Sequence, residues 1–257
     1  MLGAIIGDII GSVYEFDNLR RTDFEPLFHP DSDFTDDTVC TIAVAAALLD
    51  GLDPAAMLLD WCRRYPGRGY GGRFADWLRR GDLKPYNSFG NGSAMRVAPA
   101  ALLARTLEEA ATLARQVTVV THSHPEGVKG AVATTEAIFL ARHGVDAAAI
   151  RTHVATVHGY DMARSTDEIR PVYRFNETCQ ETVPEALICA LEADGFEAAI
   201  RLAISIGGDS DTVAAIAGPV AEARFGVPES IAEAARAKLP GDMLEVLARL
   251  YARTGPL

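Results

Sequence analysis

The sequence of 257 residues contains no apolar run long enough to span a membrane. A spanning helix needs about 20 consecutive apolar residues, and the longest runs here fall short of that length. The first residues, Met1 to Asp8, also lack the basic segment and the cleavage site of a secretory signal. We therefore expect a soluble, cytoplasmic protein that has no membrane partner.

Cysteine is scarce, and its spacing excludes the common cysteine motifs. The chain has four cysteines, at positions 40, 62, 179 and 189, and no two of them form a CxxC pair. A disulfide framework is typical of small secreted domains with many cysteines. We expect four buried free thiols instead.

Positive charge is also in short supply. Lys and Arg number 24 against 35 Asp and Glu, which gives a formal net charge of −11. A protein that follows a nucleic-acid backbone needs a basic surface, so this class of partner is not expected. A small anionic ligand stays open, because bound divalent cations would attract a diphosphate locally.

What the sequence does have is two acidic clusters, residues 34–38 and 207–212, each before an Ala-rich apolar helix. Helix starts favour negative charge. If the clusters face each other, two like charges about 4 Å apart repel by roughly 4 kcal/mol at an effective dielectric constant of about 20, so only cations would hold them together. Singly, each cluster also reads as an ordinary N-cap. The candidate metal ligands are Thr35, Asp36, Asp37, Asp209, Asp211 and Thr212.

The side-chain chemistry of the clusters indicates which cations they prefer. Neither cluster contains His or Cys. Hard oxygen donors suit Mg²⁺, Mn²⁺ or Ca²⁺ rather than zinc or copper. Adjacent aspartates can also be divided between two ions about 3.5–4 Å apart, as in two-metal hydrolases.

Apolar periodicity predicts helices throughout, and therefore an all-α fold in a single domain over residues 1–257. Three segments rich in turn residues, 17–32, 65–92 and 159–182, are expected to be loops, and loops of this length are often functional. After the first helix, the expected helices are 39–50, 54–64, 94–105, 107–114, 125–142, 147–157, 184–193, 195–205, 211–225, 231–238 and 241–253.

The first helix carries glycines at positions 3, 7 and 11, one turn apart, which would let another helix approach closely. Asp8, Ser12 and Glu15 would share one face of this helix. A carboxylate in so apolar a segment is costly unless it is paired or bound to metal. Asp8 can instead bond a neighbouring helix, and Glu15 can be a solvated helix end.

Three further motifs are candidates for ligand contacts. Residues 90–96 lead into a helix with two glycines, which suits a phosphate or ribose cradle or a simple turn. His122 stands before another helix start, where a ligand contact and a structural role are about equally expected. Tyr70, in a glycine-rich segment, suits a loop that closes over a ligand, or a mobile turn.

Taken together, these motifs resemble the ADP-ribosylglycohydrolase family. They occur in the family's order and span most of the chain. The matching residues are Gly7-Asp8, Gly11 and Glu15; Thr35-Asp36-Asp37-Thr38; Gly90-Asn91-Gly92-Ser93-Ala94-Met95-Arg96; Thr121-His122; and Gly208-Asp209-Ser210-Asp211-Thr212.

The resemblance implies an all-helical fold around two Mg²⁺ or Mn²⁺ ions, with the six cluster residues named above as ligands. It also implies that Asn91, Gly92, Ser93 and His122 contact ADP-ribose. The expected reaction is hydrolysis of the anomeric bond of an ADP-ribosylated protein or small molecule, with ADP-ribose as product. Glu15, or a metal-bound aspartate such as Asp36 or Asp209, would handle the proton of the water.

The leaving group stays open among arginine, serine, acetate and a nucleobase. Two rival functions fit the same residues. One is a dinuclear nucleotide phosphohydrolase, in which the ions activate water against phosphorus. The other is an ADP-ribose-binding module with a structural metal pair.

Overall fold

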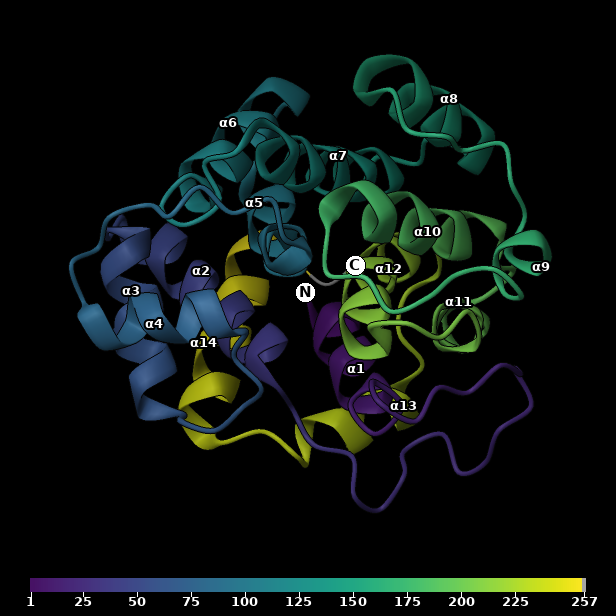
Figure 1. The fold of residues 1–257 in the computed structure, drawn as a ribbon, viewed down its shortest axis with the longest axis horizontal. Coiled ribbons are helices and arrows are strands. Elements are labelled where there is room, and N and C mark those ends of the chain that lie inside the picture. Colours follow the sequence, from purple (N-terminus) through teal and green to yellow (C-terminus); the bar gives the residue numbers. More distant parts are fainter. Residues whose placement is uncertain (256–257) are drawn as a thin grey trace.

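Helices and the loops between them make up the chain in a computed structural model that describes residues 1–255 (Figure 1). No strand occurs in that range, so the predicted all-α fold is confirmed. None of the helices described has the length and apolar character needed to cross a bilayer. The helices are α1 (Leu2–Gly11), α2 (Asp36–Asp50), α3 (Pro54–Arg64), α4 (Gly72–Arg80), the 3₁₀ turn η1 (Asn91–Ser93), α5 (Ala98–Leu103), α6 (Leu107–Thr118), α7 (Pro125–Arg142), α8 (Ala147–His158), α9 (Thr166–Ile169), α10 (Cys179–Glu192), α11 (Phe196–Ser205), α12 (Ser210–Phe225), α13 (Glu229–Arg236) and α14 (Gly241–Thr254).

Helices α1 and α12 lie side by side near the centre of the molecule (Figure 1). Every residue of α1 is buried, as is α12 from Ser210 to Glu222, which is the pattern of helices apolar on all sides. A Cβ on Gly3 would lie 2.3 Å from the carbonyl oxygen of Gly218, and one on Gly7 would lie 2.1 Å from that of Ala214. The glycine stripe therefore permits the close helix contact predicted for it.

Four helices surround this central pair and bring loops to one end of it. Helices α2, α7, α10 and α11 all pack against α12, and α2 also packs against α1. The largest apolar cluster extends from Met1, just before the first helix, to Leu250 in the last. All four cysteines are buried free thiols, as expected.

The predicted helices are present, with shifted ends at several places. Helix α4 lies inside the segment expected to be a loop. Glycines on both sides and four charged residues within it conceal a short amphipathic helix. Helix α9 is a single turn in the third predicted loop. Helix α10 begins at Cys179 rather than at Pro184, because tertiary contacts tolerate a proline in its second turn.

The first helix ends earlier than expected, which changes the position of Glu15. Helix α1 stops at Gly11, and residues 12–17 form turns and bends. Ser12 bonds locally, donating its hydroxyl to the carbonyl of Ile9. The prediction that Asp8, Ser12 and Glu15 share one helix face is therefore wrong, and Glu15 is held by the turn after the helix.

Candidate metal and ligand site

The two acidic clusters meet at the N-terminal ends of α2 and α12. The Thr212 hydroxyl donates to Oδ2 of Asp37 at 3.2 Å. A second contact joins the threonine of the first cluster to an aspartate of the second, with Oγ1 of Thr35 3.5 Å from Oδ2 of Asp211. Segments about 175 residues apart in the sequence thus share one buried polar centre, which is the convergence that the sequence predicted.

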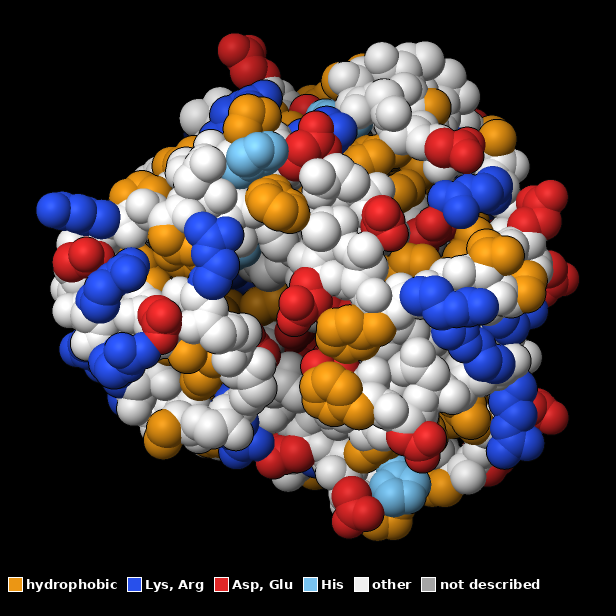
Figure 2. All heavy atoms as spheres, viewed as in Figure 1, with side chains coloured by type: hydrophobic (Ala, Val, Ile, Leu, Met, Phe, Trp, Pro, Cys, Tyr) orange, Lys and Arg blue, Asp and Glu red, His pale blue; other side chains and the backbone are white. Residues whose placement is uncertain are grey.

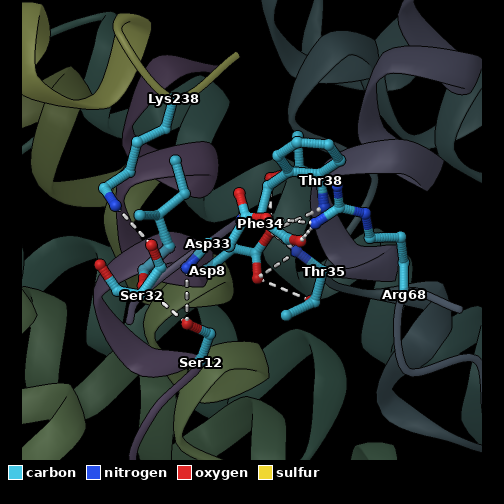
Figure 3. A network of polar contacts seen from close by, with 10 residues as sticks. Asp8, Ser12, Ser32, Asp33, Phe34, Thr35, Thr38, Arg68 and Lys238 are labelled. Carbon is cyan, nitrogen blue, oxygen red and sulfur yellow. Dashed lines mark hydrogen bonds and ion pairs between the residues drawn. The ribbon is translucent and has the colours of Figure 1, made fainter. Parts of the chain in front are cut away.

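Asp8 of α1 is buried in this centre and is hydrogen-bonded to the start of α2 (Figure 3). Its carboxylate accepts bonds from the backbone N–H groups of Thr35, at 3.0 Å, and Thr38, at 3.1 Å. The hydroxyls of both threonines also donate to it. Burial raises the pKa of Asp8 to about 6, although these hydrogen bonds oppose the rise. Asp8 therefore positions the start of α2 and adds a third carboxylate.

Arg68 fixes the segment that leads into α2 (Figure 3). Its guanidinium donates to Oδ2 of Asp33 at 2.5 Å and to the carbonyl of Phe34 at 3.0 Å, and lies over the Phe34 ring at 3.7 Å. Its own carbonyl accepts the N–H of Asp36 at 2.7 Å. These contacts set the backbone position from which Asp36 and Asp37 project.

A glycine turn positions the second cluster. Gly208 has φ of +76°, a conformation that glycine adopts without strain, and a Cβ there would lie 2.4 Å from the Tyr173 ring. Asn18 clamps the turn, accepting the Gly208 N–H at 2.7 Å and donating to its carbonyl at 2.9 Å. Asp209 follows directly, and its Oδ2 accepts the Asn91 side-chain amide at 2.6 Å.

Within the described residues, carboxylate oxygens converge in two groups of three that share Asp211. One contains Asp8 and Asp37, and the other contains Glu15 and Asp209; in each group the oxygens lie within 4.8 Å of one another. Burial and the neighbouring carboxylates raise the pKa of Asp211 and Asp37 well above the ordinary value. Such crowding is unfavourable at neutral pH unless cations or protons compensate it.

One atom in the centre lacks any hydrogen-bond partner. Oδ1 of Asp37 is buried and unbonded, whereas Oδ2 of the same carboxylate accepts from Thr212. An unsatisfied buried carboxylate oxygen is costly. Together with the oxygen donors around it, this atom fits a divalent cation, and we conclude that the residues are suited to hold hard metal ions.

Asp36 and Glu15 are only partly buried, whereas Asp37 and Asp211 are buried. Burial, then the charges of Asp211 and Asp8, raise the pKa of Asp36. Glu15 is half-buried, and burial, followed by the charges of Asp211, Glu177 and Asp8, raises its pKa to about 7. Both side chains line the adjacent cavity, so both can reach a bound ligand or water.

The centre opens into a cavity of about 320 Å³, the size of a small-molecule site. Figure 2 shows acidic side chains inside the hollow on this face and hydrophobic side chains at its edge. Three of the predicted ligand-contact residues, Asn91, Gly92 and His122, line the cavity. The described residues of its wall include Glu15, Thr35, Asp36, Asp37, Arg73, Tyr86, Phe89, Asn91, Gly92, Arg96, His122, Glu177, Asp209, Asp211 and Thr212.

His122 is buried beside two cationic residues. Burial, followed by the charges of Arg96 and Arg73, lowers its pKa well below the ordinary value, so its imidazole is neutral at pH 7. Its Nδ1 lies 2.8 Å from the Thr121 hydroxyl, which also accepts a bond from Arg96 at 2.6 Å. Its Nε2 lies against Gly92, where a Cβ would approach it to 3.4 Å.

Tyr70 and Ser93, two of the predicted ligand contacts, are not among the residues that line the cavity. The Tyr70 hydroxyl donates to the carbonyl of Tyr65 at 2.7 Å, and its ring packs against Phe74. Ser93 is fully buried and donates to the carbonyl of Gly127 at 2.8 Å. The glycines next to Tyr70 line the cavity instead, because the tyrosine ring fills an apolar space behind them.

The structure adds three charged cavity residues that the sequence alone did not identify. Arg96 is 1% exposed, and its Nε has no hydrogen-bond partner in the described structure. It ends the quoted segment 90–96, and Arg73 ends the glycine-rich segment 68–73, so both stood inside motifs already singled out. Glu177 had no such signal, since it lies in a loop without a motif.

With this geometry in hand, the comparisons with other proteins identify the family. A family model described as ADP-ribosylglycohydrolase matches residues 1–256. The chain belongs to the ADP-ribosylglycohydrolase family. The resemblance stated from the sequence motifs is therefore confirmed.

Individual relatives of this ADP-ribosylglycohydrolase chain are distant but match along most of their length. ADP-ribosylhydrolase ARH3 of Mus musculus is 26% identical, over 90% of this chain and 84% of its own. ADP-ribosylarginine hydrolase Tri1 of Pseudomonas putida (strain GB-1) is 28% identical, over 88% of this chain and 70% of its own. A solved structure titled ADP-ribosylglycohydrolase-related protein complex has the same fold, with a TM-score of 0.71 at 23% identity, covering 98% of this chain and 97% of that one.

Proposed function

We propose that this protein is a metal-dependent hydrolase that cleaves the anomeric bond of an ADP-ribosyl group and releases ADP-ribose. One observation carries the proposal. Two groups of three carboxylates share Asp211 at the wall of a ligand-sized cavity. Membership of the ADP-ribosylglycohydrolase family and the activities for which the two relatives are named support the same reaction.

The proposed cofactor is a pair of Mg²⁺ or Mn²⁺ ions. Asp37, Asp209 and Asp211 would hold them, with Thr35, Asp36 and Thr212 as further oxygen ligands and Asp8 behind them. Bound there, divalent ions supply positive charge that orients sugar hydroxyls and stabilises negative charge as it develops. The unpartnered Oδ1 of Asp37 is the observation that favours a cation over a purely hydrogen-bonded centre.

Three carboxylates of the chain are candidates for accepting the proton of the attacking water. Glu15 lines the cavity and its carboxylate lies close to that of Asp211, so it is placed to accept the proton of the attacking water. Asp36 and Asp209 are the alternative proton acceptors. Asn91 donates to Asp209 and thereby fixes the orientation of that carboxylate.

The part of the cavity wall around His122 is suited to the anionic part of the ligand. Neutral His122 presents Nε2 beside the backbone of Gly92, and the cations of Arg73 and Arg96 lie on the same wall. A diphosphate placed there would gain charge-assisted hydrogen bonds. This division puts the ribose, with its anomeric carbon, next to the acidic centre.

Product analysis tests the proposal. The protein, supplied with Mg²⁺, is incubated with peptides ADP-ribosylated on arginine or on serine, with acetylated ADP-ribose and with a dinucleotide, and products are separated by mass. Free ADP-ribose from any of them supports the proposal. AMP, with the ribose phosphate still attached to the rest of the substrate, would show a phosphohydrolase. Tight ADP-ribose binding without turnover of any substrate would show a binding module. The Asp211→Asn variant, prepared identically, excludes a contaminating hydrolase.

A further inference from the structure

A second group of metal-ligand side chains lies on α7 and α8, away from the acidic centre. Nε2 of His153 and Nε2 of His158 each lie 2.7 Å from the same oxygen, Oε2 of Glu136. These three atoms are within 4.8 Å of one another. The two imidazoles thus converge on one oxygen of one carboxylate, which brings three possible ligand atoms together.

The surroundings of this group favour a bound cation. Glu136 is 7% exposed, and no Lys or Arg of residues 1–255 forms an ion pair with it, so only the two imidazoles face its charge. The side chain of His158 is almost fully covered, whereas that of His153 is 23% exposed. The exposed edge of His153 gives an ion a route in from solvent.

The group is separate from the proposed catalytic site. Gly127, near the start of α7, packs against Ser88 and Phe89 of the cavity wall. Glu136 lies further along the same helix, and at about 1.5 Å of rise per residue it is about 14 Å from Gly127. Changes at Glu136 or His153 therefore leave the acidic centre and the cavity wall in place.

From this geometry we infer a Zn²⁺ site formed by Glu136, His153 and His158, with water as the fourth ligand. Two imidazoles and one carboxylate are a ligand set that zinc and similar transition metals prefer, in contrast to the oxygen-only acidic centre. Ligand atoms of a tetrahedral zinc lie about 3.3 Å apart when each bond is about 2.0 Å. Small rotations of the two imidazoles that lengthen each observed 2.7 Å contact by about 0.6 Å would give that spacing.

A bound ion would fix the C-terminal end of α8. This helix packs on α7 and α10 at the edge of the molecule (Figure 1). His153 lies in its middle and His158 is its last residue, while Glu136 belongs to the central helix α7. Coordination would therefore join the peripheral helix to the core at two points, and because zinc binds the folded chain it would raise the melting temperature.

Zinc titration of the full chain, with the acidic centre filled by excess Mg²⁺, tests the inference. A chromogenic zinc chelator reports the free ion, and Co²⁺ reports the geometry, since tetrahedral cobalt absorbs visible light far more strongly than octahedral cobalt. We expect one equivalent of Zn²⁺ to bind, a rise in the melting temperature, and a tetrahedral cobalt spectrum.

Two variants and one control separate the site from non-specific binding. His153→Ala removes a partly exposed ligand, and Glu136→Gln keeps an acceptor for the histidines but removes the charge. Each is expected to weaken zinc binding by at least about 100-fold, beyond the roughly 10–100-fold effect of losing a supporting residue. The control is His29→Ala, because exposed His29 lies 3.7 Å from Asp31 but belongs to no such group of three within the described chain.

Equal zinc affinity in the wild type and His153→Ala, or no zinc uptake by the wild type, would overturn the inference. The three side chains would then be only a hydrogen-bonded link between α7 and α8. The zinc measurement uses no ADP-ribosylated substrate, so its outcome and that of the proposed hydrolase activity are independent.

Discussion

Gly7 of α1 lies against the backbone of Ala214 of α12 so closely that a Cβ on Gly7 would be 2.1 Å from the Ala214 carbonyl oxygen. This contact sets the separation of the two central helices. Asp8 follows Gly7, and Asp211 lies one turn before Ala214, so the same contact sets the distance between the carboxylates that the two helices contribute. A methyl group added at Gly7 would therefore change the distance between Asp8 and Asp211 in the acidic centre.

Gly7→Ala is expected to destabilise the protein by about 3 kcal/mol or more, because the methyl group meets backbone that cannot move aside independently. In a chain of this size that corresponds to a fall of about 6–12 °C in the melting temperature. The control is Gly241→Ala, at the first residue of α14, where a Cβ meets nothing within 4 Å. Equal melting temperatures for the two variants would contradict the role given to the helix contact.

Glu15→Gln should keep the protein folded, able to bind Mg²⁺ and able to bind ADP-ribose. Its kcat should fall by about 10²–10⁴-fold, the usual effect of losing a general acid–base group. Turnover and calorimetric titration of the same preparation separate the two properties. Activity close to the wild type would remove Glu15 from the mechanism and leave it as a partly solvated turn residue.

Asp211→Asn should lose metal binding and turnover together, because Asp211 belongs to both carboxylate groups. In the wild type, removal of divalent ions should lower the melting temperature, and Mg²⁺ or Mn²⁺ should raise it again. These two ions, but not Zn²⁺, should restore activity. The variant should show no melting shift with Mg²⁺. Activity of the wild type that survives exhaustive chelation would contradict the metal assignment.

The stabilisation by Mg²⁺ should be larger at pH 7.5 than at pH 5. Burial raises the pKa of Asp8 and of Asp209 from 3.8 to about 6, so the folded metal-free chain binds more protons than the unfolded chain between these values. Protonation of these carboxylates therefore stabilises the metal-free chain below about pH 4, and this stabilisation is lost as the pH rises through about 6. Mg²⁺ replaces it at the higher pH, which is why the effect of Mg²⁺ should grow.

The contribution of His122 to stability changes with pH in the opposite direction. Its pKa is lowered in the folded state, so the folded chain gains stability relative to the unfolded chain as the pH rises. The quantity to measure is therefore the difference in melting temperature between Mg²⁺-loaded and metal-free protein at each pH, in which the His122 contribution cancels. A difference that does not grow with pH would show that the carboxylates are not protonated in the metal-free centre.

Tyr70→Phe should leave KM and kcat unchanged and reduce the free energy of unfolding by about 0.5–1.5 kcal/mol. The reason is that the Tyr70 hydroxyl donates to the Tyr65 carbonyl and the ring lies behind the cavity wall. Denaturant unfolding and steady-state kinetics measure the two effects. A raised KM with unchanged stability would restore Tyr70 as a ligand contact.

The sequence by itself determined the fold class, the helix contact and the composition of the acidic centre. Apolar periodicity is a local property, so long helices such as α3 and α7 were located to the residue. Gly3 and Gly7 showed the close contact because only glycine leaves room for a second backbone. The aspartates at two helix starts showed hard-ligand chemistry because carboxylates are costly to gather without cations.

Only the tertiary structure decided which side chains reach the cavity. Tyr70 and Ser93 stood in segments with the right composition, yet packing turns Tyr70 to the core and Ser93 to the Gly127 carbonyl. Arg96 lines the cavity because the turn before α5 meets the loop before α7 there, a relation between distant segments that no local pattern encodes. In the same way, Glu136 and His153 are unremarkable in sequence, and their convergence exists only because α8 folds back onto α7.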